Sequence, residues 1–309
     1  MKKFIISIDS SCDCRIDELK QKGISVIYFK YSDEAFTFED TMNEKSYKNF
    51  YQQIRDGSVF KTTQINPQEF YNYFKLMLNQ NLPIIHICLG SGLSNTINSL
   101  QIAINQLKEE NPKSTILPID SKIASLGLTV LLNKLYEYQC NGDDAITAYN
   151  KVKNLVDNVI AYFTTNTLTY FARGGRLSKV SAFIGNAIKI NPILYVDPDG
   201  KLRIVDKVRG SKHAINQLIV RTKNSAIDPF NQEVLVCHAD CVDKAHEVGK
   251  LLVDQVGFKN YKVYFMGPIV GAHTGPGLVA VFFLGKKRTY STSLITEKEK
   301  KELKKEMNK

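Results

Sequence analysis

Three short polar stretches of the sequence carry groups that can hold an anion. They are residues 91–96 (Ser-Gly-Leu-Ser-Asn-Thr), 171–176 (Phe-Ala-Arg-Gly-Gly-Arg) and 271–277 (Gly-Ala-His-Thr-Gly-Pro-Gly). Each places hydroxyl, guanidinium or imidazole groups beside glycines, which allow the backbone to approach a ligand closely. Arginine forms paired, charge-assisted hydrogen bonds with carboxylates and phosphates. We therefore predict that the three stretches meet in one site for a carboxylate or a phosphate.

The first stretch lies where an anion site is expected in an α/β sheet. It follows an apolar segment, 83–89, and opens an amphipathic segment, 95–109, so its free N–H groups would lie at the positive end of a helix dipole. Residues 9–11 (Asp-Ser-Ser) and 120–122 (Asp-Ser-Lys) follow apolar segments in the same way, and ligands of open α/β sheets gather at the carboxyl ends of strands. Helix capping by Ser94 would also explain a serine at this position.

The other polar groups differ in how strongly they indicate a ligand. Residues 61–64 (Lys-Thr-Thr-Gln) either supply further hydroxyls or cap a helix that begins near Pro67, and the motif taken alone favours capping. Arg173 and Arg176 flank a glycine pair and suit bidentate contact with an anion. A lone histidine is more often structural, so the glycines and proline around His273 are what make it a candidate.

The elements that must position these groups change in character along the chain. In the first half, apolar strands separated by amphipathic segments predict a largely parallel sheet. These strands are expected at 3–9, 24–29, 83–89 and 114–120. One helix is expected from about 127 to 137, and a second helix is expected to end at 156. In the second half, strands are expected at 188–196, 202–208, 234–237, 261–265 and 278–284, with helices at 211–223 and 242–256. We predict the α/β fold class, with domains at 1–157 and 158–290 and a charged, helix-prone tail at 291–309.

Composition narrows the class of protein. Six scattered cysteines in 309 residues suit a reducing compartment, and no apolar run has the length of a membrane span, so we expect a cytoplasmic protein. The formal charge of +10 favours an acidic partner, an anionic membrane surface or an anionic ligand. Because no stripe of cations interleaved with aromatics is present, we expect no nucleic acid. The spacing of Cys237 and Cys241 is imperfect for half a zinc site, and we expect no metal.

Two enzyme classes remain as alternatives. Residues 90–95 resemble a dinucleotide-binding fingerprint with asparagine in place of the last glycine. Residues 92–96 resemble the nucleophile elbow of a serine hydrolase that would use Ser94, Asp120 and His273, with threonine in place of the last glycine. The sequence contains no G-x-x-x-x-G-K-[ST] loop and no kinase signature set, so we expect that this chain does not bind ATP.

Taken in order along nearly the whole chain, the motifs identify a family. They are residues 9–11, 62–64, 91–96, 120–122 with Ser125 and Gly127, 174–176, 199–201, 207–210 and 271–277. As a set they resemble the DegV family of fatty-acid-binding proteins, the B subunit of bacterial fatty acid kinase. This resemblance implies two α/β domains of the DegV type, with a ligand site between them.

The resemblance also implies which residues form that site. A long-chain fatty acid would lie in an apolar tunnel, to which the stretch 182–190 contributes, with its carboxylate near the surface. The residues expected to bind the carboxylate are Thr62, Ser94, Arg173, Arg176 and His273. The supporting loops are expected to contain Thr63, Ser91, Gly92, Gly174, Gly175, Thr274 and Gly275.

The same resemblance implies a carrier with no catalytic residue and no cofactor. A separate ATP-dependent kinase subunit would phosphorylate the presented carboxylate to an acyl phosphate, which serves phospholipid synthesis. Burial of about sixteen methylenes at ~0.8 kcal/mol each makes tight binding reachable from the tail alone. Hydrogen bonds to the carboxylate, worth ~1.5 to 3 kcal/mol each, would offset the cost of taking it out of water.

Overall fold

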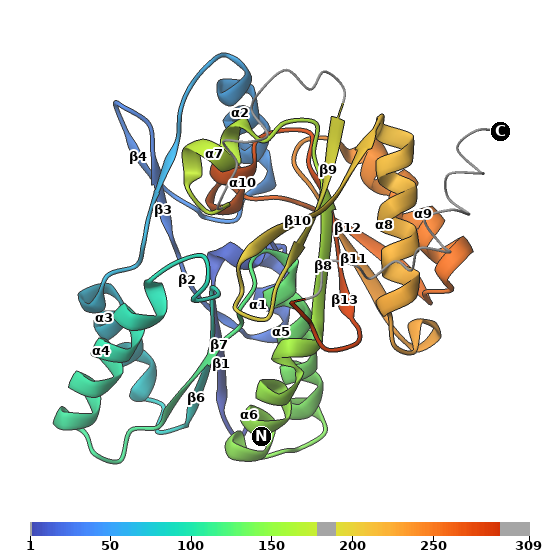
Figure 1. Ribbon diagram of the computed structural model, residues 1–309. Helices are drawn as coiled ribbons and strands as arrows, with labels where there is room; N and C mark the ends of the chain where they lie inside the picture. Colours follow the sequence, from blue (N-terminus) through green and yellow to red (C-terminus); the bar gives the residue numbers. More distant parts are fainter. Residues whose placement is uncertain (1, 178–189, 291–309) are drawn as a thin grey trace.

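The computed structural model describes residues 2–177 and 190–290. Its first sheet is parallel throughout and has the strand order β2-β1-β6-β7 (Figure 1). The strands are β1 (Ile5–Asp9), β2 (Ser25–Ile27), β6 (Ile84–Cys88) and β7 (Ile116–Asp120). Each lies within a predicted apolar segment, so the predicted parallel sheet is confirmed.

Helices lie between these strands and after the last of them. They are α1 (Ile16–Lys22), α2 (Glu44–Arg55), α3 (Pro67–Leu78), α4 (Thr96–Glu110), α5 (Leu126–Cys140) and α6 (Ala145–Leu155), with single turns η1 (Ser10–Cys12) and η2 (Val156–Asn158). Helix α3 begins as predicted, because Asn66 and Glu69 form a reciprocal capping box in front of Pro67. Helix α5 contacts strands of both large sheets, and its mostly apolar sequence is that of a helix buried between them.

A small antiparallel sheet, ordered β4-β3-β5, projects from the first half of the chain (Figure 1). Its strands are β3 (Lys30–Ser32), β4 (Thr37–Glu39) and β5 (Lys61–Thr63). Our sequence analysis did not predict this sheet, because strands of three residues are too short to show an alternating pattern. It matters for the site because β5 carries Thr62.

The second half forms a six-stranded mixed sheet ordered β10-β9-β8-β13-β11-β12. Its strands are β8 (Val159–Thr164), β9 (Ile190–Val196), β10 (Leu202–Arg209), β11 (Glu233–His238), β12 (Asn260–Phe265) and β13 (Val279–Leu284). Strands β11 and β12 run parallel, and the other described neighbours run antiparallel. The helices of this half are α7 (Thr169–Gly174), α8 (Ser211–Ser225), η4 (Pro229–Asn231), α9 (Val242–Val256) and α10 (Pro268–Thr274).

The two faces of this sheet have different neighbours. Along β13, Val279 and Val281 belong to a core formed with α8 and α9, whereas Ala280 and Phe282 belong to the core shared with the first half. This alternation is the period of two expected for a strand buried on both faces. The face that carries Ala280 therefore looks toward the first half of the chain.

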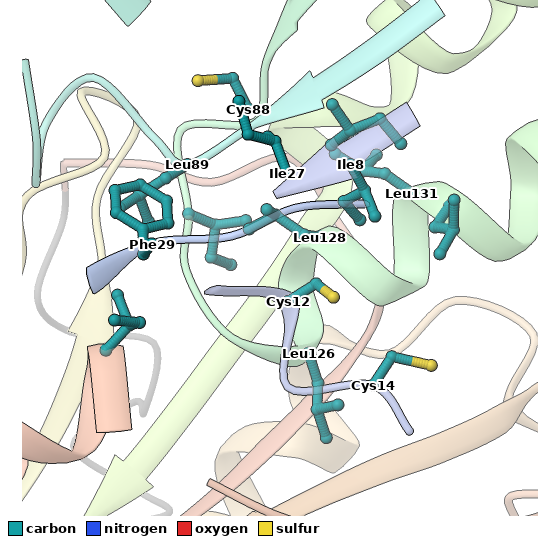
Figure 2. Packing of buried hydrophobic residues seen from close by; sticks show 14 of the residues in the cluster. Ile8, Cys12, Cys14, Ile27, Phe29, Cys88, Leu89, Leu126, Leu128 and Leu131 are labelled. Carbon is teal, nitrogen blue, oxygen red and sulfur yellow. The ribbon is translucent and has the colours of Figure 1, made fainter. Parts of the chain in front are cut away.

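The shared core joins the elements of the first half tightly. Figure 2 shows Leu128 and Leu131 of α5 packed near Ile8 of β1, with Cys88 at the end of β6. All four side chains are buried.

The predicted boundary between residues 157 and 158 falls just before β8; it stays a prediction, although the large sheets divide there. The predicted tail 291–309 and tunnel stretch 182–190, except Ile190, lie outside the described residues.

Candidate functional site

A cavity of about 540 Å³ lies between the first half of the chain and the six-stranded sheet. This volume is typical of pockets that hold small molecules. Its apolar wall comes from both halves, and includes Phe29, Leu89, Ile123, Ala161, Phe163, Val196, Leu202, Leu278, Ala280 and Phe282. Such a wall can take an aliphatic chain out of water.

The polar part of the cavity wall brings together Thr62, Ser94, Arg176 and His273. Thr62 Oγ1 and His273 Nε2 lie 2.8 Å apart and share a hydrogen bond between β5 and α10. The Ser94 hydroxyl lies 2.8 Å from that of Thr96 at the start of α4. The structure thus places four of the five predicted carboxylate-binding residues around one space, while their role in binding stays a prediction.

His273 is neutral near pH 7. Burial, together with the nearby positive charge of Arg176, lowers the pKa of its imidazole to about 4. Its Nδ1 is buried without a hydrogen-bond partner among the described residues. Because a buried N–H without an acceptor is costly, we assign the proton to Nε2, which then donates to Thr62 Oγ1. The Thr62 hydroxyl then keeps its own proton for an acceptor in the cavity.

Arg173, the fifth predicted residue, lines a second cavity of about 320 Å³ and is not among the described residues that line the first. Thr62, His273 and Arg176 line both cavities. The Arg173 guanidinium lies over the Tyr170 ring, 5.9 Å from its centroid. The Thr62–His273 pair is therefore shared by the first cavity, which has an apolar wall, and the second cavity, which is lined by both arginines.

The predicted supporting loops have several structural roles. Thr63 and Thr274 line the first cavity. Gly175 ends α7 with a φ of +66°, and Gly275 ends α10 with a φ of +71°, which glycine adopts without strain. Gly92 lies against the β9–β10 turn, where a Cβ on it would stand 2.5 Å from the carbonyl carbon of Gly200.

Ser91 has a structural role. Its N–H and hydroxyl donate to the two carboxylate oxygens of Asp120, at 2.9 and 2.6 Å. Lys122 N also donates to this carboxylate. Asp120 therefore ties the loop after β7 to the loop after β6, and a ligand role for residues 120–122 stays a prediction.

The loop after β1 is also structural. The carboxylate of Asp9 turns inward and accepts hydrogen bonds from Leu89 N and from the backbone and hydroxyl of Ser11. The Ser10 hydroxyl accepts from Phe29 N. Because these groups are buried and paired with protein, the predicted ligand role of residues 9–11 is wrong.

The two enzyme alternatives lack the geometry they need. In a serine hydrolase, Ser94 would bond to His273 and His273 to Asp120, but the described partners of these side chains are Thr96, Thr62 and Ser91, respectively. In a dinucleotide fingerprint the glycines make room for a pyrophosphate. Here the backbone of residues 122–123 fills the space at Gly90, and that of Gly200 fills the space at Gly92.

A buried polar network lies between the two halves and was not predicted from the sequence. Asp13, in the loop after η1, accepts hydrogen bonds from the Ser125 hydroxyl at 2.5 Å and from Gly267 N at 2.8 Å. Ser125 lines the cavity and holds φ 59° and ψ −143°, a conformation that costs energy for a residue other than glycine. Burial raises the pKa of Asp13 to about 8 and that of Asp40 to about 7.

This network predicts a fall in stability as the pH rises from about 4 to about 8. The folded pKa of Asp13 exceeds its unfolded value, so its contribution is present at low pH and is lost as pH rises through about 8. The lowered pKa values of His86, His238 and His273 change the unfolding free energy only below about pH 6.5. Between pH 6.5 and 8.5 we expect the wild type to lose about 2 kcal/mol more unfolding free energy than Asp13→Asn, which mimics the protonated acid.

Urea denaturation at a series of pH values measures this difference. In Asp13→Asn, the new side-chain amide would accept from Gly267 N through its oxygen and donate to the Ser125 hydroxyl through its nitrogen, so the variant should fold. Parallel stability curves for the two proteins between pH 6.5 and 8.5 would show that Asp13 does not carry the pH dependence.

Comparisons with known proteins agree with this architecture. A family model described as "Uncharacterised protein, DegV family" matches residues 3–286. The chain belongs to the DegV family. A DegV domain-containing protein of Clostridium perfringens is 30% identical over 286 residues, which are 92% of this chain and 98% of that protein.

Solved structures of the DegV family share the fold. A DegV lipid-binding protein from Thermotoga maritima has a TM-score of 0.82 at 25% identity and matches 93% of this chain and 100% of its own. A DegV family protein from Ruminococcus gnavus, described with vaccenic acid, has a TM-score of 0.83 at 21% identity and matches 92% and 100%. These matches confirm the predicted α/β fold class. Within the described ranges, no helix combines the length and apolar character needed to cross a membrane.

Proposed function

We propose that this protein binds a long-chain fatty acid and presents its carboxylate to a separate ATP-dependent kinase subunit. The observation that carries the proposal is a single cavity with an extended apolar wall and a polar region containing Thr62, Ser94, Arg176 and His273. The fatty-acid tail would lie against the strands β8 and β13. Its carboxylate would accept hydrogen bonds from Thr62 and Ser94, beside the positive charge of Arg176.

The energetics of the cavity favour such a ligand. Each buried methylene contributes about 0.8 kcal/mol, so a long tail supplies most of the binding free energy before ordering costs. The carboxylate loses its water on entry and needs charge-assisted hydrogen bonds in return. A neutral His273 suits this role, because it can orient the Thr62 hydroxyl toward the carboxylate.

The second cavity supports presentation of the head group. It shares the Thr62–His273 pair with the first cavity and is lined by the cations Lys61, Arg173 and Arg176. Cations placed around a transferring phosphoryl group stabilise the charge that develops there. We infer that the kinase subunit delivers phosphate through this cavity and that Arg173 serves that step, with the acyl phosphate as product.

The remaining assignments follow from this role. We propose that the protein acts in the cytoplasm as a non-catalytic carrier, supplying activated acyl chains for phospholipid synthesis. Its net charge of +10 would favour contact with an anionic membrane surface when the tail is loaded or released. No cofactor is needed for this role, since the kinase subunit supplies the ATP.

Loss of the Thr62 hydroxyl should weaken fatty-acid binding. Thr62→Val removes one hydrogen bond to the carboxylate and leaves His273 Nε2 without its partner, so we expect about a tenfold rise in Kd. Ser94→Ala should have an effect of similar direction. Isothermal titration calorimetry with palmitate or oleate measures both changes.

Thr37→Val is the matched control, because Thr37 lies in the same small sheet on β4 and is exposed. It should bind fatty acids as the wild type does. If Thr62→Val and Ser94→Ala also kept the wild-type affinity, the carboxylate would have to lie elsewhere in the cavity.

A further inference from the structure

The His273 imidazole is held from two sides. On one side its Nε2 bonds to Thr62 Oγ1 at 2.8 Å. On the other side lies Gly174, the last residue of α7. Helices α7 and α10 lie side by side (Figure 1), and this contact brings Gly174 against the ring.

The space at Gly174 is too small for any side chain. A Cβ placed on Gly174 would lie 2.5 Å from His273 Nδ1 and 3.2 Å from its Cβ and Cγ. A Cβ atom essentially never lies within 3.0 Å of a heavy atom of a residue that is distant along the chain, so the imidazole would have to move. Thr62 already holds the Nε2 atom of the ring in a hydrogen bond, so a shift of the imidazole away from residue 174 disturbs the Thr62–His273 bond.

The backbone at this position does not itself require glycine. Gly175, the next residue, has a φ of +66°, whereas Gly174 is not among the described residues with positive φ. Alanine can adopt the helical conformation of Gly174 and is favoured over glycine in helices. The close approach to His273 is therefore the constraint at residue 174.

We propose that Gly174 is a positioning residue for the carboxylate site: its missing side chain lets α7 pack on the imidazole and hold Nε2 against Thr62. The consequence for fatty-acid binding rests on the proposed function, but the ring position is a property of the free protein. In this account Gly174 acts through His273 and Thr62 and does not touch the ligand.

A double-mutant cycle tests the proposal. Gly174→Ala should raise the Kd for palmitate about tenfold, the effect of one lost hydrogen bond to a charged group, and should lower the melting temperature. In a His273→Ala background the ring is gone and only the 3.2 Å contact with the Cβ of residue 273 remains, so adding Gly174→Ala should change both quantities much less. Equal effects in both backgrounds would overturn the proposal. If the single variant does not fold, recovery of folding in the double variant supports the proposal, and failure to recover overturns it.

The titration of His273 provides a readout that a general loss of stability would not change. The chain has five histidines, so ¹⁵N-labelled imidazole signals can be resolved and His273 assigned from His273→Ala. In the wild type, burial keeps the pKa of His273 at about 4. In Gly174→Ala the displaced ring should titrate closer to its ordinary value; an unchanged titration would contradict the proposal.

Gly249→Ala is the matched control. Gly249 also lies in a helix, α9, and a Cβ on it would overlap the ring of Tyr261, which is not among the described residues that line either cavity. This variant should lose stability but keep the wild-type palmitate affinity and His273 titration. A wild type that binds no fatty acid would contradict the proposed function, yet the stability cycle and the titration would still decide the role of Gly174.

Discussion

Ala280→Phe is expected to reduce the affinity for palmitate by about 100-fold or more. Ala280 lies on the cavity face of β13 and is 2% exposed, so a phenyl ring would fill space that we assign to the tail. Loss of four or more buried methylenes at ~0.8 kcal/mol each accounts for an effect of this size. Fluorescence or calorimetric titration of the folded variant measures it.

Chain length provides an internal control for this prediction. The head-group residues are untouched in Ala280→Phe, so octanoate, which needs less of the cavity, should lose less affinity than palmitate. Ala35→Phe, at an exposed site in the β3–β4 turn, should bind both acids normally. Equal losses for octanoate and palmitate would show that the substitution acts through the fold and not by filling the tail space.

Arg173→Ala is expected to uncouple phosphorylation from fatty-acid binding. Arg173 lines the second cavity, which shares Thr62 and His273 with the first, and it is not among the described residues that line the proposed tail site. Removal of a group that stabilises transition-state charge typically costs about 100-fold or more in rate. We therefore expect acyl-phosphate formation with the cognate kinase subunit to fall by about that factor, while the Kd for the acid changes less than about threefold.

Two comparisons sharpen this experiment. Arg176 lines both cavities, so Arg176→Ala should reduce both binding and phosphorylation. Lys223→Ala removes an exposed positive charge from α8 and should change neither. Normal turnover by Arg173→Ala would remove this arginine from the phosphorylation step.

The parts of the fold that the sequence predicts are those whose burial creates a pattern. The strands of the first sheet are short apolar runs because both faces are covered, and each has a visible polar loop after it. Strand β8 was missed although it is equally apolar, since it follows α6 and η2 without an intervening glycine or proline. The small sheet was missed because its strands are too short for a period to appear.

The candidate site was predictable in its residue types but not in its pairings. Glycine context indicated His273, and the family resemblance indicated Thr62, but their hydrogen bond joins residues 211 positions apart. Nothing in the residues around Arg173 and Arg176 tells which cavity each faces. Asp13 gave no signal at all, because an acidic residue in a loop looks the same in the sequence whether it is exposed or buried between two halves.

The most direct test of the central claim is to denature the purified protein and identify the released small molecules by mass spectrometry. A lipid whose tail is enclosed should survive purification, so the account predicts a stoichiometric amount of long-chain fatty acid from the wild type and much less from Ala280→Phe. A protein that releases no fatty acid and binds none when palmitate or oleate is added would contradict the account.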